Sequence, residues 1–388
     1  MAANDGATDR IGVDLARRIY DFGLTADDLG PRLHGQAAGA KARAALTIDW
    51  PTGLDPRPQA LAFEPDVTDP LPRADVLVIT WTAAELLALA DVLTPGVNPR
   101  TRWYRYARHF EEYLPEIRGG APARMAGRLG SYYPTRIGTK SVLCVKSELH
   151  LNQDGVKTGA GTATLPVARF IEQMYDEVRP KLVITVGTAG GTLAQAELGD
   201  VMITRSVKFR CTQEFRNEPF NTVTYRSAAT VRRKHLTTAL RLMQAHAHEL
   251  TEPDFGPPTD FYEFGPNLPG HVNTPSILID GDDFPRDCPM LTTDFFEFGT
   301  STNGLDEVGC GVEMGDAVFG LIGERHGAAG PKWLVIRNAS DPRINGNLPA
   351  GPPSALNMQA HWAVWYYEAF GYWTSVNSAI ATWSQIAT

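Results

Sequence analysis

The sequence predicts an α/β fold in which helices cover both faces of one sheet. Apolar runs of the length typical of strands alternate with helical patterns along most of the chain, and uniformly apolar strands belong to sheets that are buried on both faces. Hydrophobic residues make up 43% and charged residues 21% of the 388 residues, shares that exclude a disordered or fibrous protein. A chain of this length can bury a large core.

The first strand and helix are predicted between residues 75 and 92. Residues 75–80 (DVLVIT) are a continuous apolar run typical of a strand, and residues 83–92 have a helical pattern that a Pro-Gly pair ends. Residues 1–72, which precede this strand and helix, are predicted to form an N-terminal extension. It is rich in Gly, Pro and Ala and has a short amphipathic helix at 13–20. The sequence indicates no role for this extension.

The rest of the chain continues the alternation of strands and helices. Strands are predicted at 141–145, 182–186, 200–204 and 333–337, and helices at 163–178, 231–248, 314–326 and from 356 onward. Residues 251–270 form a loop rich in Pro, Gly and Phe, and loops of this length are often functional lids or disordered segments.

Composition also narrows the partners and the compartment. The net charge of -8 disfavours a nucleic-acid binder, because the phosphate backbone is bound mainly by cationic surface. The amino terminus lacks the pattern of a secretory signal. Acidic residues interrupt the most apolar windows, so we expect no membrane-spanning helix. The four scattered cysteines form no CxxC pair, which favours a reducing, cytoplasmic location.

Three segments that follow predicted strands hold the candidate site, because ligands of open α/β sheets bind beyond the carboxyl ends of strands. They are residues 80–85, 187–191 and 338–341. The glycine run 187–191 (GTAGG) would let backbone N–H groups approach a ligand, but its spacing matches neither GxGxxG nor a P-loop, and a tight turn is the alternative. Residues 159–161 (GAG) are half of a dinucleotide fingerprint and lack its third glycine.

Each acidic candidate has a structural alternative. An Asp after a strand, such as Asp341, is often a turn or helix cap, a first-turn Glu such as Glu85 often complements the helix dipole, and Glu313 is open to an ion pair. The nine histidines show no ligand spacing, so no metal site is predicted, and no GxSxG elbow marks a serine hydrolase. No cofactor is predicted either.

Taken together and in order, four segments resemble the purine nucleoside phosphorylase and methylthioadenosine nucleosidase superfamily. Residues 75–85 (DVLVITWTAAE) look like its opening strand and acidic helix. Residues 180–191 (PKLVITVGTAGG), continued by 198–203 (LGDVMI), look like its central glycine signature and the strand after it. Residues 311–314 (GVEM) resemble its VEME segment, and residues 337–341 (RNASD) are similar to its R-A-x-S-D.

The resemblance implies a three-layer α/β/α sandwich with a central mixed, partly barrel-like sheet. It places a catalytic domain at 73–388, with insertions near 97–140 and 251–287. It implies a homo-oligomer that hydrolyses the N-glycosidic bond of a small-molecule purine nucleoside or nucleotide. Composition leads us to expect neither nucleic acid nor a membrane as a partner.

The resemblance also implies roles for individual residues. Asp341 would be the general acid that protonates N7 of the purine, supported by Ser340, and Glu85 would position and activate water. Thr188 and Ala189 would lie beside the anomeric carbon. The full set implied to bind the substrate is Thr188, Ala189, Gly190, Phe296, Glu313, Met314 and Asp316.

Two departures from the family pattern bear on the substrate. Gly315 stands where the family's second VEME glutamate holds the ribose hydroxyls, so either Asp316 or Glu313 takes over, or sugar recognition differs, or activity is lost. Thr185 stands where hexameric phosphorylases carry a phosphate-binding arginine, which favours water as the nucleophile.

Two other functions stay open at this point. A phosphorylase is the nearest alternative, because a cation from elsewhere could swing into the site; the candidates are Arg205, Lys208, Arg210 and Arg343. A non-catalytic nucleoside-binding or sensor module is the other, since Gly315 removes a family contact. The presence of both Glu85 and Asp341 favours an enzyme, because a pure binder needs neither a proton donor nor an activated water.

Overall fold

The structure is a computed structural model that describes residues 46–251, 274–350 and 357–388. Its centre is four neighbouring parallel strands, which lie in the order β5 (Lys140–Ser147), β2 (Val76–Thr80), β8 (Leu182–Gly191) and β15 (Lys332–Asp341). Almost all of their residues are buried. Because the four strands are parallel, their carboxyl ends meet at one edge of the sheet, where open α/β sheets bind ligands.

Shorter strands extend this centre into one large mixed sheet, and two others form a separate small sheet. They are β1 (Arg57–Pro58), β3 (Tyr104–Tyr106), β4 (Gly130–Ile137), β6 (Lys157–Gly159), β7 (Thr162–Ala163), β9 (Val201–Thr204), β10 (Ser206–Phe209), β11 (Thr224–Arg226), β12 (Ile277–Ile279), β13 (Met290–Thr292) and β14 (Gly311–Glu313). Strand β8 is a branch point, since it pairs in parallel with β2 and β15 while Gly190 and Gly191 at its end pair with the antiparallel β14.

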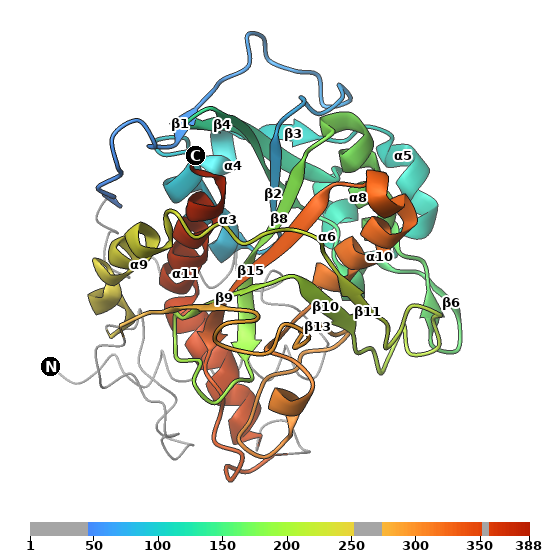
Figure 1. The fold of residues 1–388 in the computed structure, drawn as a ribbon. Helices are drawn as coiled ribbons and strands as arrows, with labels where there is room; N and C mark the ends of the chain where they lie inside the picture. Colours follow the sequence, from blue (N-terminus) through green and yellow to red (C-terminus); the bar gives the residue numbers. More distant parts are fainter. Residues whose placement is uncertain (1–45, 252–273, 351–356) are drawn as a thin grey trace, which may run out of the picture.

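Helices form a layer on each side of the central strands (Figure 1). On one side, α11 (Met358–Ile386) packs against α3 (Ala83–Leu93), α9 (Leu236–Gln244) and strands β8 and β15. On the other side, α8 (Pro166–Val178) and α10 (Asp316–His326) pack together. The remaining α-helices of the described residues are short: α4 (Pro99–Arg102), α5 (Phe110–Tyr113), α6 (Pro122–Ala126) and α7 (Leu151–Asp154). The predicted α/β fold with a mixed sheet is confirmed.

The turn that leads into α3 is fixed by its own sequence. The Thr82 hydroxyl accepts a hydrogen bond from the Glu85 N–H at 3.3 Å, and the Glu85 carboxylate accepts one from the Thr82 N–H at 2.9 Å. This reciprocal capping box satisfies N–H groups that the first helical turn leaves unpaired. It also turns the Glu85 carboxylate back toward the end of β2.

Every predicted strand and helix within the described residues forms, with shifted bounds. Residues 187–191 and 338–341, which were predicted to follow strands, instead continue β8 and β15, because the two strands pair with each other as far as Asp341. The tight-turn reading of the glycine run is therefore wrong. The predicted helix at 231–248 is shorter, since α9 begins at Leu236 and ends at Gln244. The predicted helix at 13–20 and most of the 251–270 loop lie outside the described residues.

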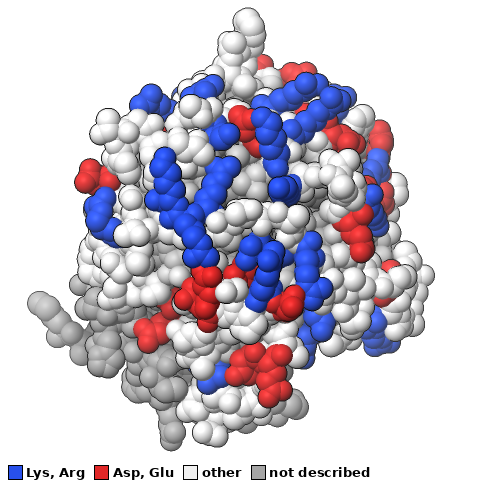
Figure 2. Space-filling view, in the orientation of Figure 1, with Lys and Arg blue, Asp and Glu red and all other residues white. Residues whose placement is uncertain are grey.

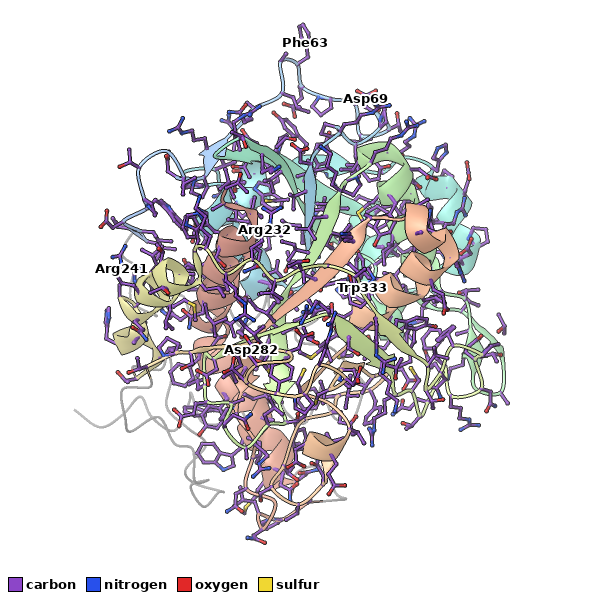
Figure 3. All side chains as sticks on the ribbon, viewed as in Figure 1. Phe63, Asp69, Arg232, Arg241, Asp282 and Trp333 are labelled. Carbon is purple, nitrogen blue, oxygen red and sulfur yellow. The ribbon has the colours of Figure 1, made fainter. Side chains whose placement is uncertain are left out.

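The described part of the N-terminal extension, residues 46–72, packs on the rest of the molecule. Strand β1 pairs with β4, the Trp50 and Trp383 ring centroids lie 4.8 Å apart, and Trp383 Nε1 donates to the Leu54 carbonyl at 2.7 Å. Phe63 projects from this segment into solvent with 86% of its surface exposed (Figure 3). The division into an extension and one catalytic domain stays a prediction. Among the described helices, none combines the length and the apolar character that a membrane crossing requires.

Candidate active site

One cavity lies at the carboxyl ends of the four central strands. Its lining residues are Trp81, Thr82, Glu85, His150, Asn152, Thr188, Ala189, Gly190, Thr293, Phe296, Glu297, Val312, Glu313, Met314, Gly315, Arg337, Ser340, Asp341, Val364 and Tyr367. All the site residues predicted from the sequence are among them except Asp316. The fold therefore brings together side chains that are far apart along the chain.

Asp341 ends β15 and is only 7% exposed. The Ser340 hydroxyl donates to its Oδ1 at 2.9 Å, and its Oδ2 lies against Gly190, where an added Cβ would be 2.9 Å away. Burial raises the pKa of Asp341 to about 7, against the smaller opposing effect of the Ser340 hydrogen bond. Near neutrality this carboxyl group therefore holds a proton in a large fraction of molecules, as a general acid must.

Glu85 is also buried but has the opposite electrostatic character. Its Oε2 accepts hydrogen bonds from the Thr80 hydroxyl and from the next two backbone N–H groups, at 2.8 to 3.0 Å. Its Oε1 accepts from the backbone N–H and the hydroxyl of Thr188, at 2.7 and 2.9 Å. Burial alone would raise the pKa of Glu85, but the Arg337 charge and the backbone N–H donors lower it below its usual value. Glu85 is therefore a fixed anion.

Arg337 connects the carboxylates behind the cavity. It is 3% exposed and binds Asp316 through two hydrogen bonds, Nε to Oδ2 at 2.9 Å and Nη2 to Oδ1 at 2.6 Å. Its guanidinium also lies 3.3 Å from Glu313 Oε2 and 3.5 Å from Glu85 Oε1. Three acidic groups thus surround one cation, and a buried cation that is already paired in this way has little charge left for a second anion.

Asp316 does not lie where the sequence prediction put it. It is fully buried, its carboxylate is held by Arg337, and it is not part of the cavity wall. Glu313 does line the cavity, and its Oε2 accepts from the Gly315 N–H at 2.6 Å. Burial, and next the nearby Asp316 charge, raise the pKa of Glu313. Of the two proposed replacements for the ribose glutamate, only Glu313 is in a position to meet a ligand.

The space beside Gly315 is filled by Trp81. A Cβ added at position 315 would lie 3.3 Å from Cζ2 and 3.4 Å from Cε2 of the indole. The ring is further held edge-on against Phe319, with centroids 5.9 Å apart, and the Arg337 guanidinium lies 5.0 Å from it. A longer side chain at position 315 would have to displace this indole.

Gly187 is a position beside the site that tolerates no side chain. A Cβ there would lie 2.1 Å from Glu85 Oε1 and 2.6 Å from Arg337 Nη1, so Gly187→Ala must push both groups away. We expect this variant to lose about 1–3 kcal/mol of unfolding free energy, as overpacked cores do, together with most of its activity. Thermal unfolding of Gly119→Ala is the matched control, because nothing lies within 4 Å of a Cβ there. Equal stability and activity of the two variants would contradict this description of the site.

Several lining residues were given no role from the sequence. Arg337 opens the 337–341 segment, and the signal for a role of its own is a charge inside an otherwise apolar, buried strand. Trp81 follows β2 within the 75–85 segment, whereas His150 precedes α7 and Asn152 lies in it, and neither of these two belongs to a motif. Glu297 is held by Arg210, and burial raises its pKa against the effect of that cation.

The four cations considered as phosphate ligands do not line the cavity. Arg205 is paired with Asp280, Arg210 with Glu297 and Arg343 with Asp306. Among the lining residues, all of which belong to the described part of the chain, Arg337 is the only Lys or Arg. Thr185, the position where the family phosphorylases carry their arginine, is fully buried in β8 and also lies outside the cavity wall. Figure 2 shows basic and acidic side chains sharing the face of the molecule seen in Figure 1.

Comparison with known proteins gives matches by structure only. No family model and no curated sequence matches the chain. The futalosine hydrolase of Helicobacter pylori strain 26695 is similar at 11% identity and a TM-score of 0.42, over 80% of this chain and 96% of that one. A 5'-methylthioadenosine/S-adenosylhomocysteine nucleosidase of the same organism matches at 11% identity and 0.42, over 81% and 98%. The corresponding nucleosidase of Neisseria meningitidis matches at 15% and 0.39, over 80% and 97%.

Proposed function

We propose that the protein hydrolyses the N-glycosidic bond of a purine nucleoside or nucleotide, releasing the free base and a sugar. The observation that carries this proposal is a pair of buried acids in one cavity with opposite protonation. Asp341, with a pKa of about 7, is suited to donate a proton, and Glu85, with a lowered pKa, is suited to remain an anion. Pairs of this kind assign the acid and the charged partner in glycosidases.

The positions at which the two acids contact β8 support a displacement by water. Glu85 Oε1 binds the Thr188 N–H, and Asp341 Oδ2 lies against Gly190, two residues further along the same strand. Two residues of a strand span ~7 Å. In enzymes that attack a glycosidic bond directly with water, the carboxyl groups are ~6.5–9.5 Å apart, which leaves room for the water and the sugar carbon.

The chemical step then divides between the two groups. Asp341 gives its proton to N7 of the leaving purine as the bond to the anomeric carbon lengthens, and Ser340 orients the carboxyl group. The sugar carbon gains positive charge, which the Glu85 anion stabilises while it orients the attacking water with Thr188 and Arg337. Because its pKa is lowered, Glu85 acts mainly through charge and position, and takes up the water proton only late in the step.

The apolar wall of the cavity suits a flat base and a sugar ring. Phe296 and Met314 line it, and Phe296 packs with Phe298 at a centroid distance of 5.7 Å. Ala189 and Gly190 present backbone close to the position of the anomeric carbon, and aromatic and backbone surface of this kind binds planar ligands.

Phosphorolysis has weaker support, because the described residues that line the cavity include no Lys or Arg that is free to bind a dianion. Arg337 is already surrounded by three acidic groups, and Glu85 stands where phosphate would attack. Like charges a few Å apart repel by about 4 kcal/mol at the effective dielectric of a protein surface.

The pH dependence of turnover tests the acid directly. Asp341 donates only when protonated, so kcat should be constant below its pKa of about 7 and fall as the pH rises above it. The decline should be about tenfold per pH unit. Asp341→Asn should remove this limb from the pH–rate profile. A profile that rises through the same range would show that the group acts as a base.

The function itself is tested by incubating the protein with adenine and guanine nucleosides and their 5'-monophosphates, with and without phosphate, and identifying the products. We expect free base and free sugar in both buffers. Release that requires phosphate, with a sugar 1-phosphate as product, would replace the hydrolase with the phosphorylase. Binding without any release of base would favour the non-catalytic module.

A further inference from the structure

We propose that the end of the cavity beside β2 and β5 is a polar subsite, in which Trp81 and Asn152 bind hydroxyl groups of the sugar. The identity of the ligand rests on the proposed function. The existence of the subsite rests on the two side chains themselves.

Both side chains lie in the cavity wall, and each has a polar atom without a partner. Trp81 is 6% and Asn152 is 7% exposed, and neither Nε1 of Trp81 nor Oδ1 of Asn152 makes a hydrogen bond in the structure. Buried polar groups are nearly always hydrogen-bonded, because an unpaired one keeps its full desolvation cost. An N–H donor and an amide acceptor that border the same cavity therefore point to a ligand that pairs with both.

The order of the strands indicates which part of the ligand reaches them. Asp341 ends β15, Thr188 is in β8, Trp81 follows β2 and Asn152 lies just beyond β5, and these strands are consecutive neighbours in the sheet. If the leaving base is at Asp341 and the anomeric carbon near Thr188, the rest of the sugar extends past Trp81 toward Asn152. Trp81 then meets a ring hydroxyl, and Asn152 meets the 5' hydroxyl.

The chemistry of the two atoms selects an uncharged, hydroxylated sugar. A hydroxyl group accepts from the indole N–H or donates to the amide oxygen, whereas a phosphate dianion has no proton for the unpaired amide oxygen of Asn152. Lys146 and Arg128 are both held by Glu148, and Arg118, which donates to the Asn152 carbonyl, is paired with Glu214. A nucleoside with a free 5' hydroxyl therefore fits the subsite better than a nucleotide does.

Trp81 also changes what the sugar must supply. A glutamate at position 315 would need a sugar group that donates a hydrogen bond, whereas the indole N–H needs one that accepts it. The indole occupies the space next to Gly315, and its N–H can pair with any sugar oxygen that has a lone pair. A ring hydroxyl converted to a methyl ether keeps that lone pair, but a deoxy position does not. Removal of the sugar oxygen should therefore weaken binding at this subsite, whereas methylation of the same oxygen should keep the hydrogen bond from Trp81.

The test compares Trp81→Phe and Asn152→Leu with the parent protein on one purine ribonucleoside and its 2'-deoxy, 3'-deoxy, 5'-deoxy and 5'-phosphate analogues. Dissociation constants from calorimetry and kcat/KM values are both measured, so binding is read even if no base is released. Trp103→Phe is the matched control, because the Trp103 indole is equally buried but donates to Thr94 Oγ1 outside the cavity. Thermal unfolding checks that each variant is folded.

We expect the parent to bind the 5'-deoxy and 5'-phosphate analogues about tenfold more weakly than the ribonucleoside, the effect of one good hydrogen bond. Asn152→Leu should lose the preference over the 5'-deoxy analogue, and Trp81→Phe the preference over one ring-deoxy analogue, while Trp103→Phe keeps both. Variants that retain the parent's preferences, or a parent that prefers the 5'-phosphate, would overturn the subsite and leave the hydrolase standing. If the parent protein shows the expected hydroxyl preferences in binding but releases no base, the subsite would stand and the proposed reaction would be contradicted.

Discussion

Replacing Asp341 with Asn should lower kcat by about 100-fold or more, the usual scale of general-acid catalysis, while substrate affinity changes far less. The substitution keeps the shape of the side chain and the hydrogen bond from Ser340, but an amide cannot give up a proton to the leaving base. The measurement is a steady-state comparison of kcat and KM at a pH well below the pKa of Asp341, where nearly all of the parent carboxyl groups are protonated.

Asp200→Asn is the control for this effect. Asp200 is also buried with a pKa raised to about 6, but it accepts from the Glu197 and Ser276 N–H groups and does not line the cavity. Its variant should lose stability without a selective loss of kcat. Near-normal turnover in folded Asp341→Asn would remove Asp341 from the role of acid.

Replacing Glu85 with Gln in the parent protein should lower kcat by about 100- to 1,000-fold. This is the scale seen when a group that stabilises transition-state charge is removed. The neutral amide cannot stabilise the positive charge that develops on the sugar. It also has to turn an NH2 group toward donors, because every hydrogen bond that the Glu85 carboxylate makes in the structure is an accepted one. Stopped assays of base release at saturating substrate would measure the loss.

Part of that loss could come from a disturbed fold, and Glu177→Gln separates the two causes. Glu177 accepts hydrogen bonds from the Leu71 N–H and the Tyr106 hydroxyl and lies outside the cavity wall. The Glu177→Gln variant should have a lower unfolding temperature than the parent protein but nearly the same kcat. A Glu85→Gln protein that is folded and fully active would show that its charge plays no part in the reaction.

The acids could be identified from the sequence because each lies in a short local pattern. Glu85 follows an apolar strand and opens a helix, and Asp341 ends an apolar strand in a segment that resembles a family motif. That both would face one cavity followed from the rule that ligands bind at the carboxyl ends of parallel strands. The sequence could not show that 187–191 stays in the sheet, because that depends on pairing with a strand about 150 residues away, as the bond from Asn338 to the Gly187 carbonyl illustrates.

The role of Arg337 and the place of Asp316 could not be predicted for the same reason. Asp316 begins α10, and only the packing of that helix against β15 brings its carboxylate to Arg337. The indole of Trp81 fills the space beside Gly315 because the ends of β2 and β14 converge, which no local pattern records. Non-local pairing, more than local propensity, decides these details.

The origin of the oxygen on the product sugar tests the central claim most directly. A single turnover in H2(18)O, quenched by reduction of the sugar so that later exchange with solvent is stopped, would be analysed by mass spectrometry. We expect one solvent oxygen at the anomeric carbon in the parent protein, with and without phosphate, and almost no labelled sugar from Asp341→Asn in the same time. An unlabelled sugar 1-phosphate, or base release that Asp341→Asn leaves unchanged, would contradict hydrolysis by this pair of acids.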